Sequence, residues 1–353
     1  MVIGELAVVL AAKTQQFVTD FGKSEKAVVA FGKKTTDIGG KLSAGLTLPL
    51  LGAATAGIAL AEDLNRGMAN VATLIPGNTA RLEELKDTVQ DVQIATGKMT
   101  DELTEGMFQV ISAFGEGADT QQQFELTARA AVAGQTDLNG ALALGSAVTK
   151  AYGDTSQAAL GKVFDLAFKT NELGQTTFPE LAAAIGRVTP LANELGVSQE
   201  QLFASMATLT GVTGNTAEVS TQLSSIMRTL LAPTDTLTEL FKANGIESGK
   251  AALEQLGLQG TLKLVAGAAK ETGQPLQDFL GRAEGMVATL ALTDSQAAKY
   301  VSNLNGMANA AGAVDAAFEE QTAGINEVGF SMSQVSAKVT VLAQDFGDSL
   351  APA

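Results

Sequence analysis

The sequence predicts an all-α protein of helical hairpins and bundles punctuated by glycine, flanked by longer helices with heptad patterns. Apolar residues recur along the chain at the three- and four-residue spacing of a helix face. Many of these runs end at one of the 37 glycines, a residue that can end a helix in the left-handed conformation. Hydrophobic residues make up 46% of the chain but aromatic residues only 5%, which favours thin layers of Ala, Leu and Val over a bulky globule. One short strand is expected, at residues 3–10.

Residues 1–62 are expected to form a first, helical domain with a heptad-like seam. This N-terminal seam alternates spacings of three and four residues, and the polar Ser24 and Thr35 fill two of its positions. Six lysines between residues 13 and 41 make it the one basic part of the chain. The apolar residues of the N-terminal seam are Phe17, Phe21, Val28, Phe31, Ile38 and Leu42.

Residues 42–61 carry no charge and are followed by Glu62 and Asp63. A helix of this length could cross a bilayer, whereas its Ala, Gly and Thr content and Pro49 make its hydrophobicity modest. Two interpretations stay open: a helix packed against copies of itself or other parts of a particle, and a segment that enters a membrane. The residues that would pack or insert are Leu42, Leu46, Leu48, Pro49, Leu50, Leu51, Ile58 and Leu60.

Residues 63–294 are expected to form a second, helical core domain. A unit of helix, glycine, capping residue and helix recurs there at intervals of about 15 to 40 residues, too uneven for a solenoid repeat, so we expect stacked hairpins. Residues 177–233 should give three helices, and residues 253–269 two short helices around Gly257 and Gly260. The start and stop signals of the three helices are Thr177, Glu180 and Gly196, then Ser198, Gln201 and Gly211, then Asn215, Glu218 and Pro233.

From about residue 295 the pattern predicts a longer, uninterrupted helix and a third domain, residues 295–353. Its apolar residues repeat at spacings of three and four, which indicates a coiled coil that continues beyond the last residue. We expect copies of the chain to associate through both the N-terminal seam and this C-terminal seam. Its members are Ile325, Val328, Met332, Val335, Val339, Leu342 and Phe346.

The composition argues against an enzyme and against a nucleic-acid-binding protein. The chain has no cysteine and no histidine, which excludes disulfides, thiolate and imidazole metal sites, and Ser-His or Cys-His nucleophiles. Asp101, Glu102 and Glu105 cluster at a predicted helix start, where the helix dipole explains them. The net charge of -15 opposes binding to DNA phosphates. We expect no cofactor, no metal and no catalytic residue.

The run ELGVSQEQLFASMATLTGVTGNTAEVSTQLSSIMRTLLAP resembles the core region of phage tail tape measure proteins. Its ordered series is a Gly-Val-Ser turn, an alanine-rich helix, a glycine turn, a threonine-rich helix and a proline. The resemblance extends from about Val71 to about Gly285, and VIGELAVVLAAKTQQF and GGKLSAGLTLPLLG resemble the N-termini of the same family. It marks the chain as the N-terminal portion of something longer or an unusually short member.

The resemblance implies a structural protein of the virion that lies in the lumen of the tail tube, sets tail length during tube assembly and leaves ahead of the DNA at infection. It implies as partners other copies of the chain, in a trimer or hexamer, with the tail tube protein, tail assembly chaperones and tail tip or baseplate proteins. It also implies contact with the host membrane during DNA ejection. The alternative from a different class is a membrane-active, pore-forming helical protein in which residues 42–61 insert.

Overall fold

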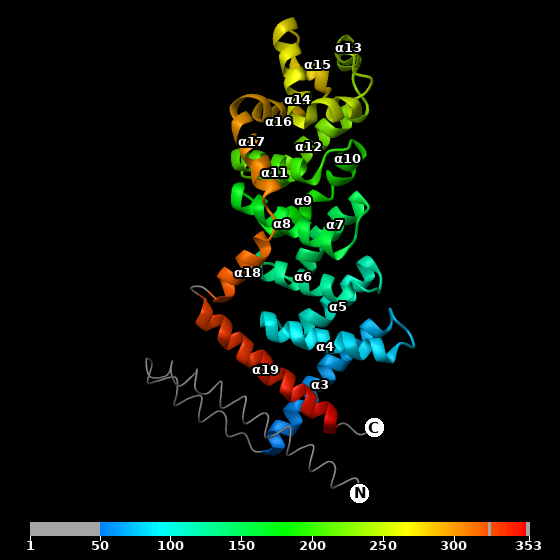
Figure 1. Cartoon of the computed structure of the whole chain (residues 1–353), viewed down its shortest axis with the longest axis vertical. Coiled ribbons are helices and arrows are strands. Elements are labelled where there is room, and N and C mark those ends of the chain that lie inside the picture. The colour runs from blue at the N-terminus through cyan, green and yellow to red at the C-terminus, as the bar shows by residue number, and fades with distance from the viewer. Residues whose placement is uncertain (1–49, 324–325, 351–353) are drawn as a thin grey trace. The chain divides into compact units, whose positions relative to one another are not determined.

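The computed structural model describes residues 50–323 and 326–350, and all regular structure in these residues is helical (Figure 1). The predicted all-α class is therefore confirmed. The strand expected at residues 3–10 and the N-terminal seam lie outside the described residues. The described chain divides into two compact units, one of residues up to 104 with those from 328 onward, the other of residues 105–327. The expected domain boundaries after residues 62 and 294 do not coincide with this division and stay predictions.

The first unit consists of α3 (Leu50–Ala72), α4 (Thr79–Thr96), the start of α5 (Thr100–Phe114) and nearly all of α19 (Glu327–Leu350). Helix α3 crosses α19 at two glycines. A Cβ added to Gly57 would lie 2.8 Å from the carbonyl oxygen of Ala343, and Gly347 packs directly on the backbone of Gly57. Polar side chains then tie α19 to its neighbours, because Asp348 accepts hydrogen bonds from Asn65 at 2.7 Å and from Lys86. The absence of a side chain at Gly57 and Gly347 therefore lets α3 and α19 approach closely.

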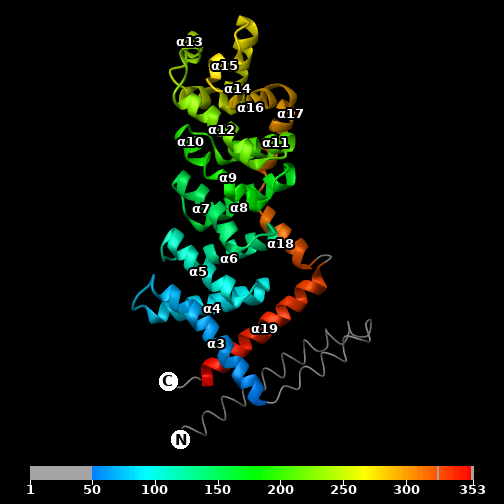
Figure 2. The same ribbon diagram turned by 180° about the vertical axis from the view of Figure 1, so that it is seen from behind.

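The second unit is a stack of helices in which the chain runs out and then returns (Figures 1 and 2). On the return, α16 packs on α12, α17 packs on α11 and α8, and α18 packs on α6 and α8. After α5, its elements are α6 (Thr120–Ala133), α7 (Leu138–Tyr152), α8 (Gln157–Leu173), α9 (Phe178–Ile185), α10 (Thr189–Glu194), α11 (Gln199–Thr213), α12 (Thr216–Leu231), α13 (Asp235–Ala243), α14 (Gly249–Thr272), α15 (Leu276–Leu280), α16 (Glu284–Leu290), the π-helix η1 (Ala291–Ser295), α17 (Ala297–Ala308) and α18 (Ala313–Ala323).

The helix boundaries follow the predicted capping chemistry closely. Both capping boxes form: Thr177 caps α9 with Glu180, and Ser198 caps α11 with Gln201. The side chain of Asn215 caps α12, as predicted. Such reciprocal bonds satisfy amide donors that a helix start otherwise leaves without partners.

Two of the predicted helix boundaries are wrong. The segment expected as one helix from 177 to 196 is two helices, α9 and α10. Pro190 lies in the first turn of α10 and has no amide hydrogen to bond back to the preceding turn, so it cannot continue α9. The second helix ends at Gly214 and not at Gly211. Gly214 takes the left-handed conformation with φ 64°, whereas Gly211 stays inside α11.

The long helix expected from residue 295 is also wrong, since the chain forms α17, α18 and α19 there. The break between α17 and α18 contains Gly312 at φ 80°, a conformation that side chains other than glycine rarely adopt. The break predicted at Gly257 is confirmed, because this residue sits at φ 68° and ψ 175° inside α14. Gly260 is helical and breaks nothing.

Threonine is abundant in the core because its hydroxyl can bond within its own helix. The buried hydroxyls of Thr127, Thr170 and Thr208 each donate to the carbonyl oxygen four residues earlier, at 2.7 to 2.8 Å. A buried hydroxyl satisfied in this way needs no partner on a neighbouring helix. These residues therefore serve as small core side chains that let the helical layers approach closely.

Candidate interaction surfaces

Helix α19 has two opposite apolar faces, and only one of them is packed. Ala337, Val341 and Gln344 are at most 8% exposed and face the rest of the first unit. The C-terminal seam lies on the other side, because residues advance by about 100° each around a helix. The exposed fraction is 50% at Val328 and 39% at Val339.

The other members of the C-terminal seam continue this face. Met332 is 41% exposed, Val335 and Leu342 are half-buried, and Ile325 lies outside the described residues. Phe346 is half-buried near the crossing with α3, where a Cβ on Gly57 would lie 3.6 Å from its ring. From Val328 to Phe346 the seam is about 27 Å long at 1.5 Å per residue. An apolar stripe of this length and heptad spacing is suited to packing against another helix.

The predicted apolar segment at residues 42–61 lies only partly within the described chain. Its first eight residues lie outside, and Leu50 and Leu51 begin α3, which continues through Glu62, Asp63 and Arg66 to Ala72. Of its apolar residues, Ile58 is 37% exposed and Leu60 is half-buried. In the described part of the chain, no helix is both long and apolar enough to cross a membrane.

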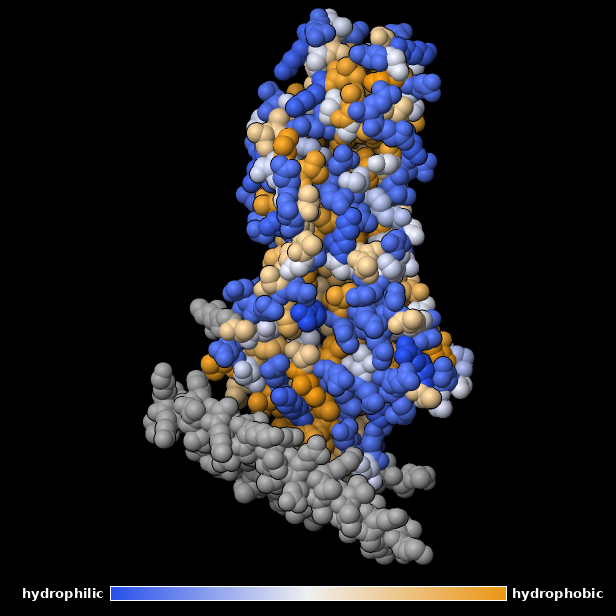
Figure 3. All heavy atoms as spheres, viewed as in Figure 1, coloured by the Kyte–Doolittle hydropathy of each residue, from blue (hydrophilic) through white to orange (hydrophobic). Residues whose placement is uncertain are grey.

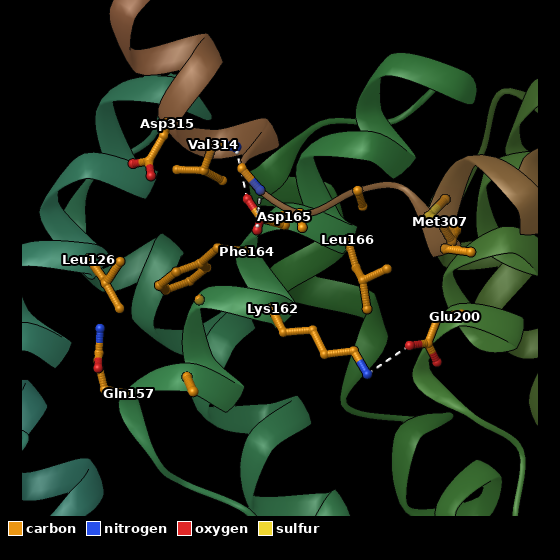
Figure 4. Close-up of a pocket in the computed structure, with 16 residues that line it drawn as sticks. Leu126, Gln157, Lys162, Phe164, Asp165, Leu166, Glu200, Met307, Val314 and Asp315 are labelled. Carbon is orange, nitrogen blue, oxygen red and sulfur yellow. Dashed lines mark hydrogen bonds and ion pairs between the residues drawn. The ribbon is translucent and has the colours of Figure 1, made fainter.

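In the second unit, a hollow of about 430 Å³ lies between α6, α8 and the linker from α17 to α18 (Figure 4). Asp165 of α8 reaches the start of α18 and accepts hydrogen bonds from the amides of Gly312 and Val314, each at 2.9 Å. A carboxylate at a helix start satisfies unpaired amides and interacts favourably with the helix dipole. This contact bridges about 150 residues of sequence, so no local pattern could have predicted it.

Further contacts hold the returning helices. Arg129 of α6 forms an ion pair with Asp315 at 2.8 Å and lies 4.6 Å from the ring centre of Phe318. At the other end of the hollow, Lys162 pairs with Glu200 at 2.7 Å (Figure 4). Burial raises the pKa of Glu200, but hydrogen bonds from Lys162 and from backbone, with the charge of Lys162, outweigh it and leave the pKa lowered. The charged groups around the hollow are thus engaged in holding the fold.

The acidic residues noted at the start of α5 are used in the same way. Asp101 and Glu102 lie in its first turn, and Glu102 accepts a hydrogen bond from Lys98 at 2.6 Å. Glu105 accepts one from Asn139 at 3.0 Å. Among the described residues, no three acidic side chains gather in an arrangement that could hold a metal ion.

Figure 3 shows hydrophilic and apolar residues interspersed over the visible surface.

A family model described as "Phage-related minor tail protein" matches residues 86–281, which is more than half of the chain. The chain belongs to this family. The match runs from α4 to the residue after α15, so it covers most of the stacked helices of the second unit. The chain is therefore a phage tail protein.

Two curated relatives are named as tape measure proteins. The chain is 27% identical over 300 residues to the "Probable tape measure protein" of Clostridium phage phiCD119, which covers 80% of this chain and 31% of that protein. It is 23% identical over 288 residues to the "Tape measure protein" of Pneumococcus phage Dp-1, covering 80% and 25%. The resemblance to tape measure proteins is confirmed, and the chain spans less than a third of the length of these relatives. No solved structure matches.

Proposed function

We propose that the chain is a tape measure component that lies in the lumen of the tail tube, where copies associate through the C-terminal seam and set the length of the tube. The observation that carries this proposal is the exposed heptad face of α19, in a family of tail proteins with relatives named for the tape measure role. Helices meet through such faces in coiled coils. The other face of α19 is already packed, so the exposed face is left for a partner.

Helix geometry suits a length-setting role. A helix rises 1.5 Å per residue, so a chain of this size drawn out as one helix would reach at most about 530 Å. The second unit turns back on itself, with α17 on α11 and α18 on α6, so in its folded form this unit spans much less than its own length as one helix. Length added to an uninterrupted helix such as α19 would extend the ruler, whereas length added to a hairpin would not.

The charge of the chain suits a passage shared with DNA. A net charge of -15 repels the phosphate backbone, so the protein would not adhere to DNA that follows it through the tube. Release ahead of the DNA at infection belongs to the proposal on this ground, whereas contact with the host membrane rests on the family resemblance alone. Its partners would be other copies, in a trimer or hexamer matching tail symmetry, and the tail tube protein, assembly chaperones and tip or baseplate proteins.

A charge on the seam tests the proposal in the phage that encodes the chain. Val339→Asp places a carboxylate in the middle of the exposed face, and Val339 is 39% exposed, so the fold of the chain should survive. We expect few tails, or tails of irregular length, in electron micrographs of lysates. The matched control is Ser336→Asp, three residues before Val339. Ser336 is exposed and flanks the seam, at a position where coiled coils accept charge. Normal tails in the Val339→Asp phage would contradict the proposal.

A further inference from the structure

The C-terminal seam has a counterpart of the same spacing elsewhere in the chain. Read backwards from Phe346, its residues are separated by four, three, four, three and four positions, ending at Val328. Read backwards from Leu42, the N-terminal seam follows the same order of spacings, ending at Ser24. In a common register the apolar pairs are Leu42 with Phe346, Ile38 with Leu342, Phe31 with Val335 and Val28 with Met332.

The attachment point of the N-terminal seam favours this pairing. Helix α3 begins at Leu50 and meets α19 at Gly57, beside the ring of Phe346. Only 15 residues therefore separate Leu42 from a point next to the end of the C-terminal seam. Sequences joined by a short link meet at an effective concentration in the millimolar range, well above that of a second copy in dilute solution. With Leu42 at the Phe346 end, the two seams would run parallel.

Charge favours the same partner. Residues 13–41 carry six lysines and three acidic residues, whereas α19 carries three acidic residues and one lysine. The N-terminal seam thus brings a net positive charge to a net negative helix. A second copy of α19 would bring a like charge, which opposes association at low ionic strength.

We propose that residues 14–42 bind the C-terminal seam of the same chain, as a parallel helix, before the tail is assembled. The occupied seam would keep free copies apart, and other copies at the assembly site would displace the segment. This inference rests on the proposed function, because it takes the C-terminal seam as the surface through which copies associate.

Cross-linking in the full chain tests the pairing, and the absence of native cysteine provides a clean background. The variant Phe31→Cys with Val335→Cys should form an intramolecular disulfide on mild oxidation at micromolar protein, because a disulfide needs Cα atoms about 4.4 to 6.8 Å apart. The control, Phe31→Cys with Thr340→Cys, places the second thiol on another side of α19, and its yield should be at least tenfold lower. Peptide mass spectrometry identifies the linkage.

Two results would overturn the pairing. One is an equal yield in the two double variants. The other is efficient linkage between chains when the single variants Phe31→Cys and Val335→Cys are mixed, because this would identify a second copy as the occupant.

A second variant separates this inference from the proposed function. Val28→Asp with Phe31→Asp removes the apolar surface of the segment without touching the described fold. We expect sedimentation to show association at protein concentrations at least tenfold lower than for the unaltered chain. If the disulfide forms but this variant stays monomeric at all concentrations, the pairing stands and self-association through the C-terminal seam fails. If the unaltered chain associates equally well and no disulfide forms, the pairing fails and self-association stands.

Discussion

Replacing Gly347 by alanine should open the crossing of α3 and α19. The added Cβ would lie 2.5 Å from the carbonyl carbon of Gly57 and 2.8 Å from the amide nitrogen of Ile58. Carbon atoms prefer separations of about 3.5 to 4.0 Å, so the helices would have to move apart by about 1 Å. The clash is with backbone, which cannot turn aside as a side chain can. Overpacking costs about 1 to 3 kcal/mol, and we expect the upper end here.

Alanine also favours the helix, which offsets part of this cost. The gain over glycine inside a helix is about 1 kcal/mol, so the net loss of free energy of unfolding should be about 2 kcal/mol. That corresponds to roughly a 30-fold rise in the opening equilibrium of the first unit. Separation would also strain the bonds from Asn65 and Lys86 to Asp348.

Hydrogen exchange followed by mass spectrometry measures this locally. Amide protection should fall in α3 and α19 and stay unchanged in α11, which belongs to the second unit. The matched control is Gly267→Ala in α14, where no atom lies within 4 Å of the added Cβ and helix propensity alone should raise protection. Unchanged or higher protection of α19 in Gly347→Ala would refute the close crossing.

Three further predictions concern the second unit. The hydroxyl of Thr289 is buried without a hydrogen-bond partner among the described residues, so Thr289→Val should raise the free energy of unfolding by about 1 kcal/mol. Thr229→Val loses a 2.7 Å hydrogen bond to the carbonyl of Leu280 and should lower the free energy of unfolding by about 1 to 2 kcal/mol. Urea titrations measure both changes. Asp165→Asn weakens the cap on α18 and should reduce its amide protection about tenfold, but Asp315→Asn, at an exposed ion pair, should change it less than threefold. The only two tyrosines are Tyr152 and Tyr300, and burial raises the pKa of both, that of Tyr300 to about 12. Their neutral forms are favoured in the folded state, so the contribution of the two tyrosines to stability should be constant below pH 10 and fall as the pH rises towards 12. Tyrosinate absorbance in the native protein that titrates near pH 10, as it does in denaturant, would contradict their burial.

The sequence predicted those features that depend on neighbouring residues. The capping boxes at Thr177 and Ser198 and the left-handed turn at Gly196 formed as expected, because their bonds span only a few residues. The break at Gly257 was predictable for the same reason. The misplaced end at Gly211 shows the limit, since two nearby glycines could each end the helix and only Gly214 does so.

Contacts between distant residues could not be predicted in this way. The spacing of Val328, Met332 and Val339 indicated a helical stripe, but only the fold shows that the opposite face of α19 is packed and that this stripe is left exposed. The cap that Asp165 places on α18 depends on the returning path of the chain. The break at Gly312 divides the expected long helix. It lies on the same returning path, where the amide of Gly312 donates a hydrogen bond to Asp165.

The most direct test of the ruler is the tail length of phage whose α19 is lengthened by six heptads, inserted between Val335 and Ser336 so that the seam continues in register. Forty-two helical residues should lengthen the tail by about 63 Å. The same residues inserted as a helical hairpin at Gly273, in the exposed turn between α14 and α15, should leave the length unchanged, because a hairpin returns to its starting point. Intact tails of unaltered length from the α19 insertion would contradict the account.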